Sequence, residues 1–145
     1  MSQTIALVDD DKNILASLSA ALEDEGYNVD IYGDGIEALE GISRKPVDLA
    51  VLDIKMPGMD GMQLLKKLMG QDSGLPVILI TGHGDVPMAV EAMRLGAFNF
   101  LEKPFEPEDL TQLIKLAAQK RRSTLESREL RQELSDSSKI IKKLA

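Results

Sequence analysis

Short, almost continuously apolar runs alternate along most of the chain with longer segments of helical periodicity. Apolar runs of this length are typical of strands that are covered on both faces, as in parallel sheets. The predicted strands are Thr4–Val8, Asn28–Tyr32, Leu49–Asp53, Val77–Thr81 and Asn99–Leu101. The predicted helices are Lys12–Asp24, Gly35–Ser43, Gly61–Met69, Val86–Leu95 and a last helix from Pro107 onward, with Gly26 and Gly96 as C-terminal caps. This alternation predicts an α/β domain with a doubly wound, five-stranded parallel sheet.

Composition limits the chemistry that such a domain can perform. The chain has 145 residues, no Cys and a single His, which is His83. These counts favour one main domain, and they exclude disulfides, thiol nucleophiles, Cys-based metal centres and sites built from several histidines. There is neither a basic leader nor an apolar run of roughly 20 residues, so we expect a cytoplasmic protein without a membrane partner.

The charge is spread unevenly between an acidic body and a mildly basic tail. The net charge is −7, and the acidic excess lies within residues 1–105. Direct binding of nucleic acid is not expected, because phosphate contacts need clustered Lys and Arg, and the tail mixes both signs.

Polar side chains stand where the predicted strands end. Asp9 and Asp10 follow the first strand, Asp53 ends the third, Thr81 ends the fourth, and Lys103 comes soon after the fifth. Because the carboxyl ends of parallel strands meet at one edge of the sheet, we expect these side chains to gather there. Asp11 also follows the first strand, but it directly precedes a helix and is predicted to be an N-cap.

The expected cluster favours phosphoryl transfer. Carboxylates that lie so near one another repel unless a cation is bound between them. A site whose ligands are all oxygen atoms favours Mg²⁺. An Asp carboxylate can then attack a phosphoryl group, while the metal ion, a Lys ammonium and a hydroxyl hold the phosphoryl oxygens.

Four motifs identify a known family by resemblance. Val8-Asp9-Asp10, the segment Leu52–Gly61, Ile80-Thr81-Gly82 and Lys103-Pro104-Phe105 resemble, in this order, motifs of the receiver domain of two-component response regulators. The resemblance implies a flavodoxin-like fold with strand order 2-1-3-4-5. It also implies a receiver domain over residues 1–119 and a helical linker over residues 120–145, which leads to an output domain beyond Ala145.

The resemblance also implies a role for each matching residue. Asp53 is the expected phosphoacceptor, and Mg²⁺ is expected to bind Asp9, Asp10, Asp53 and the backbone carbonyl of Lys55. Thr81 and Lys103 are expected to bind the phosphoryl oxygens, and the Lys103–Pro104 bond is expected to be cis. Thr81 and Phe100 are the expected switch residues, while His83 is read as an exposed loop residue.

Two further segments point to one branch of this family. Thr81–Met93 is similar to receivers of nitrogen-regulator and nitrogen-fixation type. Together with Gln119–Arg122 and the charged helix that continues from it, it resembles dicarboxylate-transport regulators. Such proteins imply a sensor histidine kinase as partner, and contact with DNA and RNA polymerase through downstream domains. No Gly-x-x-x-x-Gly-Lys-[Ser/Thr] motif for ATP occurs here.

The tail permits two interpretations. Apolar residues recur at spacings compatible with a coiled-coil seam, but Lys120, Ser123, Ser127 and Ser137 interrupt it. The tail is therefore either a solvated extension of the last helix or part of a homodimer that also uses the fourth and fifth helices. The apolar positions are Leu113, Leu116, Leu130, Leu134, Ile141 and Leu144.

The favoured function is a phosphorylation-dependent signalling switch. It would be no enzyme beyond its own phosphoryl transfer and slow self-dephosphorylation. Aspartyl phosphatases of the haloacid-dehalogenase group fit poorly, because Lys55 stands where they need a second Asp. A flavin binder of the same fold fits poorly too, because Asp9, Asp10 and Asp11 would repel its phosphate. A module that works without phosphorylation stays open.

Overall fold

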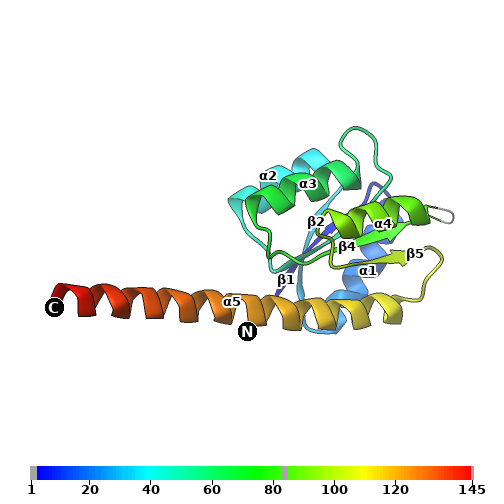
Figure 1. Ribbon diagram of the computed structural model, residues 1–145. Helices are drawn as coiled ribbons and strands as arrows, with labels where there is room; N and C mark the ends of the chain where they lie inside the picture. The colour runs from blue at the N-terminus through cyan, green and yellow to red at the C-terminus, as the bar shows by residue number, and fades with distance from the viewer. Residues whose placement is uncertain (1–2, 83–84, 145) are drawn as a thin grey trace.

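The computed structural model describes residues 3–82 and 85–144, with side chains described as far as Leu134. Strands and helices alternate along these residues (Figure 1). The elements are β1 (Thr4–Val8), α1 (Lys12–Asp24), β2 (Asn28–Tyr32), α2 (Gly35–Arg44), β3 (Leu49–Asp53), α3 (Gly61–Gln71), β4 (Val77–Thr81), α4 (Val86–Arg94), β5 (Asn99–Glu102) and α5 (Pro107–Leu144). The predicted elements are confirmed, with differences of only one or two residues at some ends.

The five strands form one parallel sheet in the order β2-β1-β3-β4-β5. This confirms the predicted fold class and strand order. The chain reverses its direction of winding between β1 and β3, and these two strands are neighbours. Ligands of doubly wound sheets bind beyond the carboxyl ends of the strands at such a point. Asp9, Asp10 and Asp53 all lie there.

Alternate residues of the inner strands supply two hydrophobic cores, one on each face of the sheet. Ala6, Ala50 and Val77 face a core that is closed by α2, α3 and α4. Ile5 and Leu49, one position earlier on their strands, face a second core that is closed by α1 and α5. Figure 1 shows α2 and α3 on one side of the sheet and α1 and α5 on the other. Because both faces are covered, the inner strands are apolar at almost every position.

Aspartates cap the N-termini of α1 and α3, at the carboxyl edge of the sheet. Asp11 caps α1, since its carboxylate accepts hydrogen bonds from the N–H groups of Asn13 and Ile14, at 2.9 and 3.3 Å, which confirms the predicted N-cap. Asp60 caps α3 through a capping box with Gln63. The next residue, Gly61, lies so close to β3 that a Cβ atom there would come within 2.4 Å of the Asp53 carbonyl oxygen. A glycine therefore lets α3 start directly behind the end of β3.

Helix α5 is 38 residues long and continues well past the body of the domain, as expected of an extended last helix (Figure 1). Its first turns pack Leu110, Ile114 and Ala117 into the second core. None of the helices in the described part of the chain is both long and apolar enough to cross a membrane.

Candidate functional site

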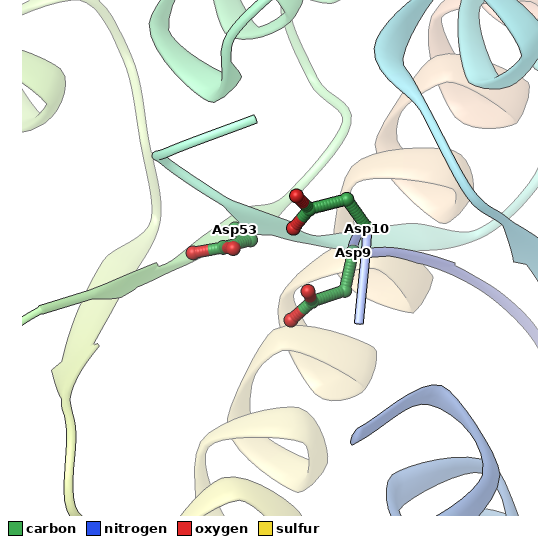
Figure 2. Close-up of side chains that lie close together, drawn as sticks. All are labelled: Asp9, Asp10 and Asp53. Carbon is green, nitrogen blue, oxygen red and sulfur yellow. The ribbon is translucent and has the colours of Figure 1, made fainter. Parts of the chain in front are cut away.

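Three carboxylates meet at the carboxyl edge of the sheet. Asp9 and Asp10 directly follow β1, and Asp53 is the last residue of the neighbouring strand β3. Figure 2 shows the three side chains gathered at these strand ends. One carboxylate oxygen from each residue lies within 4.8 Å of the other two. The structure thus brings together the acidic residues that the strand-end pattern singled out.

The three carboxylates differ in their exposure to solvent. Asp9 and Asp53 are buried, with 1% and 7% of their surface exposed, whereas Asp10 is exposed. The Oδ1 atom of Asp9 accepts a hydrogen bond of 2.9 Å from the backbone N–H of Asp11. Its Oδ2 atom is buried and has no hydrogen-bond partner within the described residues. A buried acceptor without a partner is costly, so this oxygen has the environment of a ligand atom.

Burial and mutual repulsion disfavour the charged forms of the two inner acids. Desolvation raises the pKa of Asp53 to about 6, and the negative charges of Asp9 and Asp10 contribute in the same direction. Desolvation also raises the pKa of Asp9, although the hydrogen bond from Asp11 opposes it. The Nζ atom of Lys103 lies 3.8 Å from Oδ1 of Asp53 and lowers the pKa of both acids. One ammonium therefore does not balance the charge of the three acids.

The donor set fits a small, hard cation. Every candidate ligand atom on these side chains is a carboxylate oxygen, which is the ligand type that Mg²⁺ takes. Oxygens on opposite sides of a Mg²⁺ ion lie about 4.2 Å apart, close to the spread of these three atoms. The acidic cluster is thus able to hold a metal ion.

Two other predicted site residues flank the cluster. Thr81 ends β4 and is fully buried, and its hydroxyl oxygen has no hydrogen-bond partner in the described part of the structure. Lys103 follows β5, and the Lys103–Pro104 peptide bond is cis. Both residues are next to the carboxylates, at the carboxyl ends of neighbouring strands.

The remaining predicted residues have structural partners of their own. Phe100 is half-buried on β5 and packs against the core under α3 and α4. The backbone N–H of Lys55 donates a hydrogen bond to the Asp53 carboxylate, which places this peptide beside the cluster. The role of the Lys55 carbonyl stays a prediction. His83 lies outside the described residues.

One ion pair beside the site, between Lys55 and Asp85, was not predicted from the sequence. The Nζ atom of Lys55 lies 3.2 Å from Oδ2 of Asp85, so an ion pair links the loop after β3 to the loop after β4. The two residues are far apart in the sequence, and neither belongs to a pattern that predicts pairing. The opposite charges of two residues on adjacent loops are the only signal that could have suggested it.

The family of the chain follows from a comparison of its sequence with known families. The family described as the response regulator receiver domain matches residues 5–115. The chain belongs to this family. The matched range runs from β1 into α5 and includes every residue of the acidic cluster. The family that the sequence motifs indicated is therefore confirmed.

The relatives of this receiver domain include longer transcriptional regulators. The C4-dicarboxylate transport transcriptional regulatory protein DctD of Rhizobium meliloti is 42% identical over 128 residues, which are 88% of this chain and 28% of that protein. The transcriptional regulatory protein FixJ of Bradyrhizobium diazoefficiens is 40% identical over 130 residues, 90% of this chain and 63% of that protein. The chain thus spans less than two thirds of either relative.

Solved receiver domains are similar in structure over almost their full length. A response regulator receiver domain protein from Clostridium thermocellum is 31% identical with a TM-score of 0.81, and the match covers 84% of this chain and 98% of that one. The receiver domain of NtrX from Brucella abortus is 37% identical with a TM-score of 0.76, covering 79% and 98%.

Proposed function

We propose that this receiver domain is a switch that accepts a phosphoryl group on Asp53 from a phosphohistidine of a sensor histidine kinase. The observation that carries the proposal is the cluster of three carboxylates, in which Asp53 is paired with Lys103. Receiver domains belong to two-component systems, and in such systems a kinase is the natural source of the phosphoryl group. The kinase itself is identified here only by that chemistry.

In the proposed step, a carboxylate oxygen of Asp53 attacks phosphorus. An O–P bond forms while the P–N bond to the kinase imidazole breaks. The bonding electron pair returns to the imidazole nitrogen, which then takes up a proton. The product is an acyl phosphate on Asp53.

Asp9, Asp10, Asp53 and the backbone carbonyl of Lys55 would hold Mg²⁺, which neutralises charge on the phosphoryl oxygens when it is bound. Lys103 is within 3.8 Å of Asp53, so its ammonium can bind a phosphoryl oxygen after transfer. The buried Thr81 hydroxyl, which lacks a partner among the described residues, can donate a hydrogen bond to another.

The output of the switch is proposed to be a change in shape and assembly. Movement of Thr81 toward the phosphoryl group would open space for Phe100 to repack, and would alter the surface of α4, β5 and α5. That surface carries exposed apolar side chains at Val86, Val90 and Leu116. We infer that it, together with the tail of α5, forms a homodimer. Light scattering before and after treatment with beryllofluoride and Mg²⁺ tests this part.

The division of the chain is part of the same proposal. Residues 1–119 would form the receiver, and residues 120–145 would connect it to an output domain. In relatives named as transcriptional regulators, such a domain would contact DNA and RNA polymerase, and the whole protein would act in the cytoplasm.

The direct test is to treat the chain with acetyl phosphate and Mg²⁺ and to measure its mass. We expect one phosphoryl adduct in the wild type and none when Mg²⁺ is chelated. Asp53→Asn should abolish the adduct, because an amide is not a nucleophile for phosphorus. The matched control is Asp11→Asn, which changes a neighbouring acid but keeps an N-cap side chain. A full adduct in Asp53→Asn, or none in the wild type, would overturn the proposal.

A further inference from the structure

The amino end of the sheet holds a second group of charges, far from Asp53 along the strands. Asp72 follows α3 in the loop that leads into β4. Its Oδ2 atom accepts a hydrogen bond of 2.7 Å from Arg121, and its Oδ1 atom accepts one of 2.8 Å from Arg128. Both arginines belong to α5, so one carboxylate on the body is bound by two guanidinium groups on the last helix.

The contact is built into the body of the domain. The Arg121 side chain is only 8% exposed, although Arg121 lies just past residues 1–119, the range expected for the receiver domain. Asp72 Oδ1 also accepts a hydrogen bond from the backbone N–H of Gly74, at 3.0 Å. Gly74 lies beside the Arg128 guanidinium. The loop after α3 thus supplies both the carboxylate and a backbone donor at this contact.

Charge favours the same arrangement. Asp72 stands directly after the C-terminus of α3, where the helix dipole adds negative potential and attracts cations. Arg128 and Arg121 hold the pKa of Asp72 well below its ordinary value, and Arg128 has the larger effect. The carboxylate therefore stays ionised and paired at neutral pH.

The two arginines also define which way α5 faces. They are seven residues apart, which is almost two helical turns, and they continue the stripe of Ile114 and Ala117 that packs into the core. Three exposed leucines of the helix, Leu116, Leu130 and Leu134, lie on the opposite side by the same periodicity and form a leucine stripe, whereas the less exposed Leu125 lies nearer the arginines. Fixing the arginine stripe thus points the leucine stripe away from the body.

We propose that Asp72 is a docking site on the receiver body for the linker part of α5. Its ion pairs with Arg121 and Arg128, here called the Asp72 clamp, fix the direction in which this helix leaves the domain. In proteins, most of the stability of a helix comes from packing against the rest of the fold, so contacts with the body favour an ordered linker segment.

The clamp makes residues 121–128 move with the receiver as one body. Any change at α5 in the receiver would then reach the tail as a rigid displacement, and the leucine stripe would stay turned outward. That consequence rests on the proposed phosphorylation switch, whereas the clamp itself does not.

Spin labels can measure the direction of the helix. The chain has no cysteine, so Glu40→Cys on α2 and Glu129→Cys on α5 introduce the only two labelling sites, and both positions are exposed. The labelled chain is diluted with unlabelled chain so that distances within one molecule dominate. We expect a narrow distance distribution, which becomes at least twice as wide in Asp72→Asn and partly wider in Arg128→Ala.

Three controls separate the clamp from other effects. Arg131→Ala removes the same charge about one turn further along α5, from a residue that no ion pair joins to the body in the described part of the structure, and should leave the width unchanged. Asp72→Glu should keep most of the narrow distribution. Arg128 is partly exposed, so Arg128→Ala tests the clamp even if Asp72→Asn fails to fold. The distribution should also stay narrow in Asp53→Asn, which separates the clamp from phosphorylation. A broad distribution in the wild type, or equal widths in the wild type and both clamp variants, would overturn the proposal.

Discussion

At the carboxyl end of the sheet, three carboxylates gather, and within the described residues Lys103 forms an ion pair with Asp53 alone. At the amino end, the carboxylate of Asp72 is shared by two arginines. The first group has too much negative charge and a buried oxygen on Asp9 without a partner among the described residues. In the second, Asp72 has hydrogen bonds to both of its oxygens, although Nε and Nη1 of the buried Arg121 have no partner among the described residues.

This difference indicates that the acidic cluster is a ligand-binding site and that the Asp72 clamp is a structural contact. Burial raises the pKa of Asp53 to about 6, so the folded domain holds that carboxylate in an unfavourable ionised state at neutral pH. A bound cation would remove the penalty. The pKa of Asp72 is lowered instead, so its ionised state stabilises the folded domain as it stands. The pKa values of Asp53 and Asp72 are thus shifted in opposite directions.

The largest expected effect is on metal affinity at the carboxyl end. Asp10→Ala should weaken Mg²⁺ binding by about a hundredfold, because it removes a charged oxygen ligand. Lys103→Ala should leave the affinity close to that of the wild type or raise it, since an ammonium cannot ligate a cation. Calorimetric titration with Mg²⁺ measures both, and equal affinities for the wild type and Asp10→Ala would contradict the assignment.

The next largest effect is on stability at the amino end. Asp72→Asn should lower the free energy of unfolding by about 2 kcal/mol, because it leaves the buried Arg121 without a charged partner. This is less than the loss for a fully buried pair, since Asp72 itself is partly exposed. Urea unfolding measures the change. Asp24→Asn, at an exposed acid that ends α1, is the control and should shift stability by no more than about 0.5 kcal/mol.

Neutralising Asp53, at the carboxyl end of the sheet, should change the free energy of unfolding in the opposite direction. Asp53→Asn should raise the free energy of unfolding at pH 7.5, without Mg²⁺, by about 1 kcal/mol, because it relieves the repulsion with Asp9 and the desolvation of a charge. The gain should disappear when Mg²⁺ is added, since the ion stabilises only the ionised wild type. A clear loss of stability in the metal-free variant would show that Asp53 is a structural acid.

The fold and the members of the acidic cluster could be predicted because both depend on local sequence patterns. Runs such as Val77–Thr81 are strand-like by themselves, and parallel strands necessarily bring Asp9 and Asp53 to one edge. The N-cap at Asp11 was predictable for the same reason, because a capping side chain contacts its own helix.

Contacts between distant segments could not be predicted in this way. Asp72 and Arg128 are separated by 56 positions, and nothing in the charged pattern of α5 distinguishes Arg121 and Arg128 from Arg122 or Arg131. The apolar stripe of Ile114 and Ala117 places both arginines on the inner side of α5, but only the packing of α5 against the body brings them to Asp72. The pair of Lys55 and Asp85 depends in the same way on the relative placement of two loops.

The smallest predicted effect is the pH dependence of stability. The raised pKa of Asp53 means that the folded, metal-free domain binds this proton more tightly than the unfolded chain, so its stability should rise by about 0.5–0.8 kcal/mol from pH 7.5 to 5.5. Asp72 changes the stability with pH in the opposite direction. Its lowered pKa adds stability above the ordinary value of 3.8, and that stability is lost as the pH falls below it. Urea midpoints from pH 7.5 down to about 3 test both signs, and a steady loss of stability from pH 7.5 downward would contradict the account.

The contrast between the two ends can be measured in one sample by carbon-13 NMR titration of the aspartate carboxyl groups, with and without Mg²⁺. We predict that Asp53 titrates near pH 6 without the ion and at a clearly lower pH with it, because a bound cation favours the carboxylate. Asp72 should titrate below the ordinary value of 3.8 in both conditions. If Asp53 instead titrates near 4 and does not respond to Mg²⁺, the carboxyl end of the sheet is not the metal-dependent phosphoacceptor site proposed here.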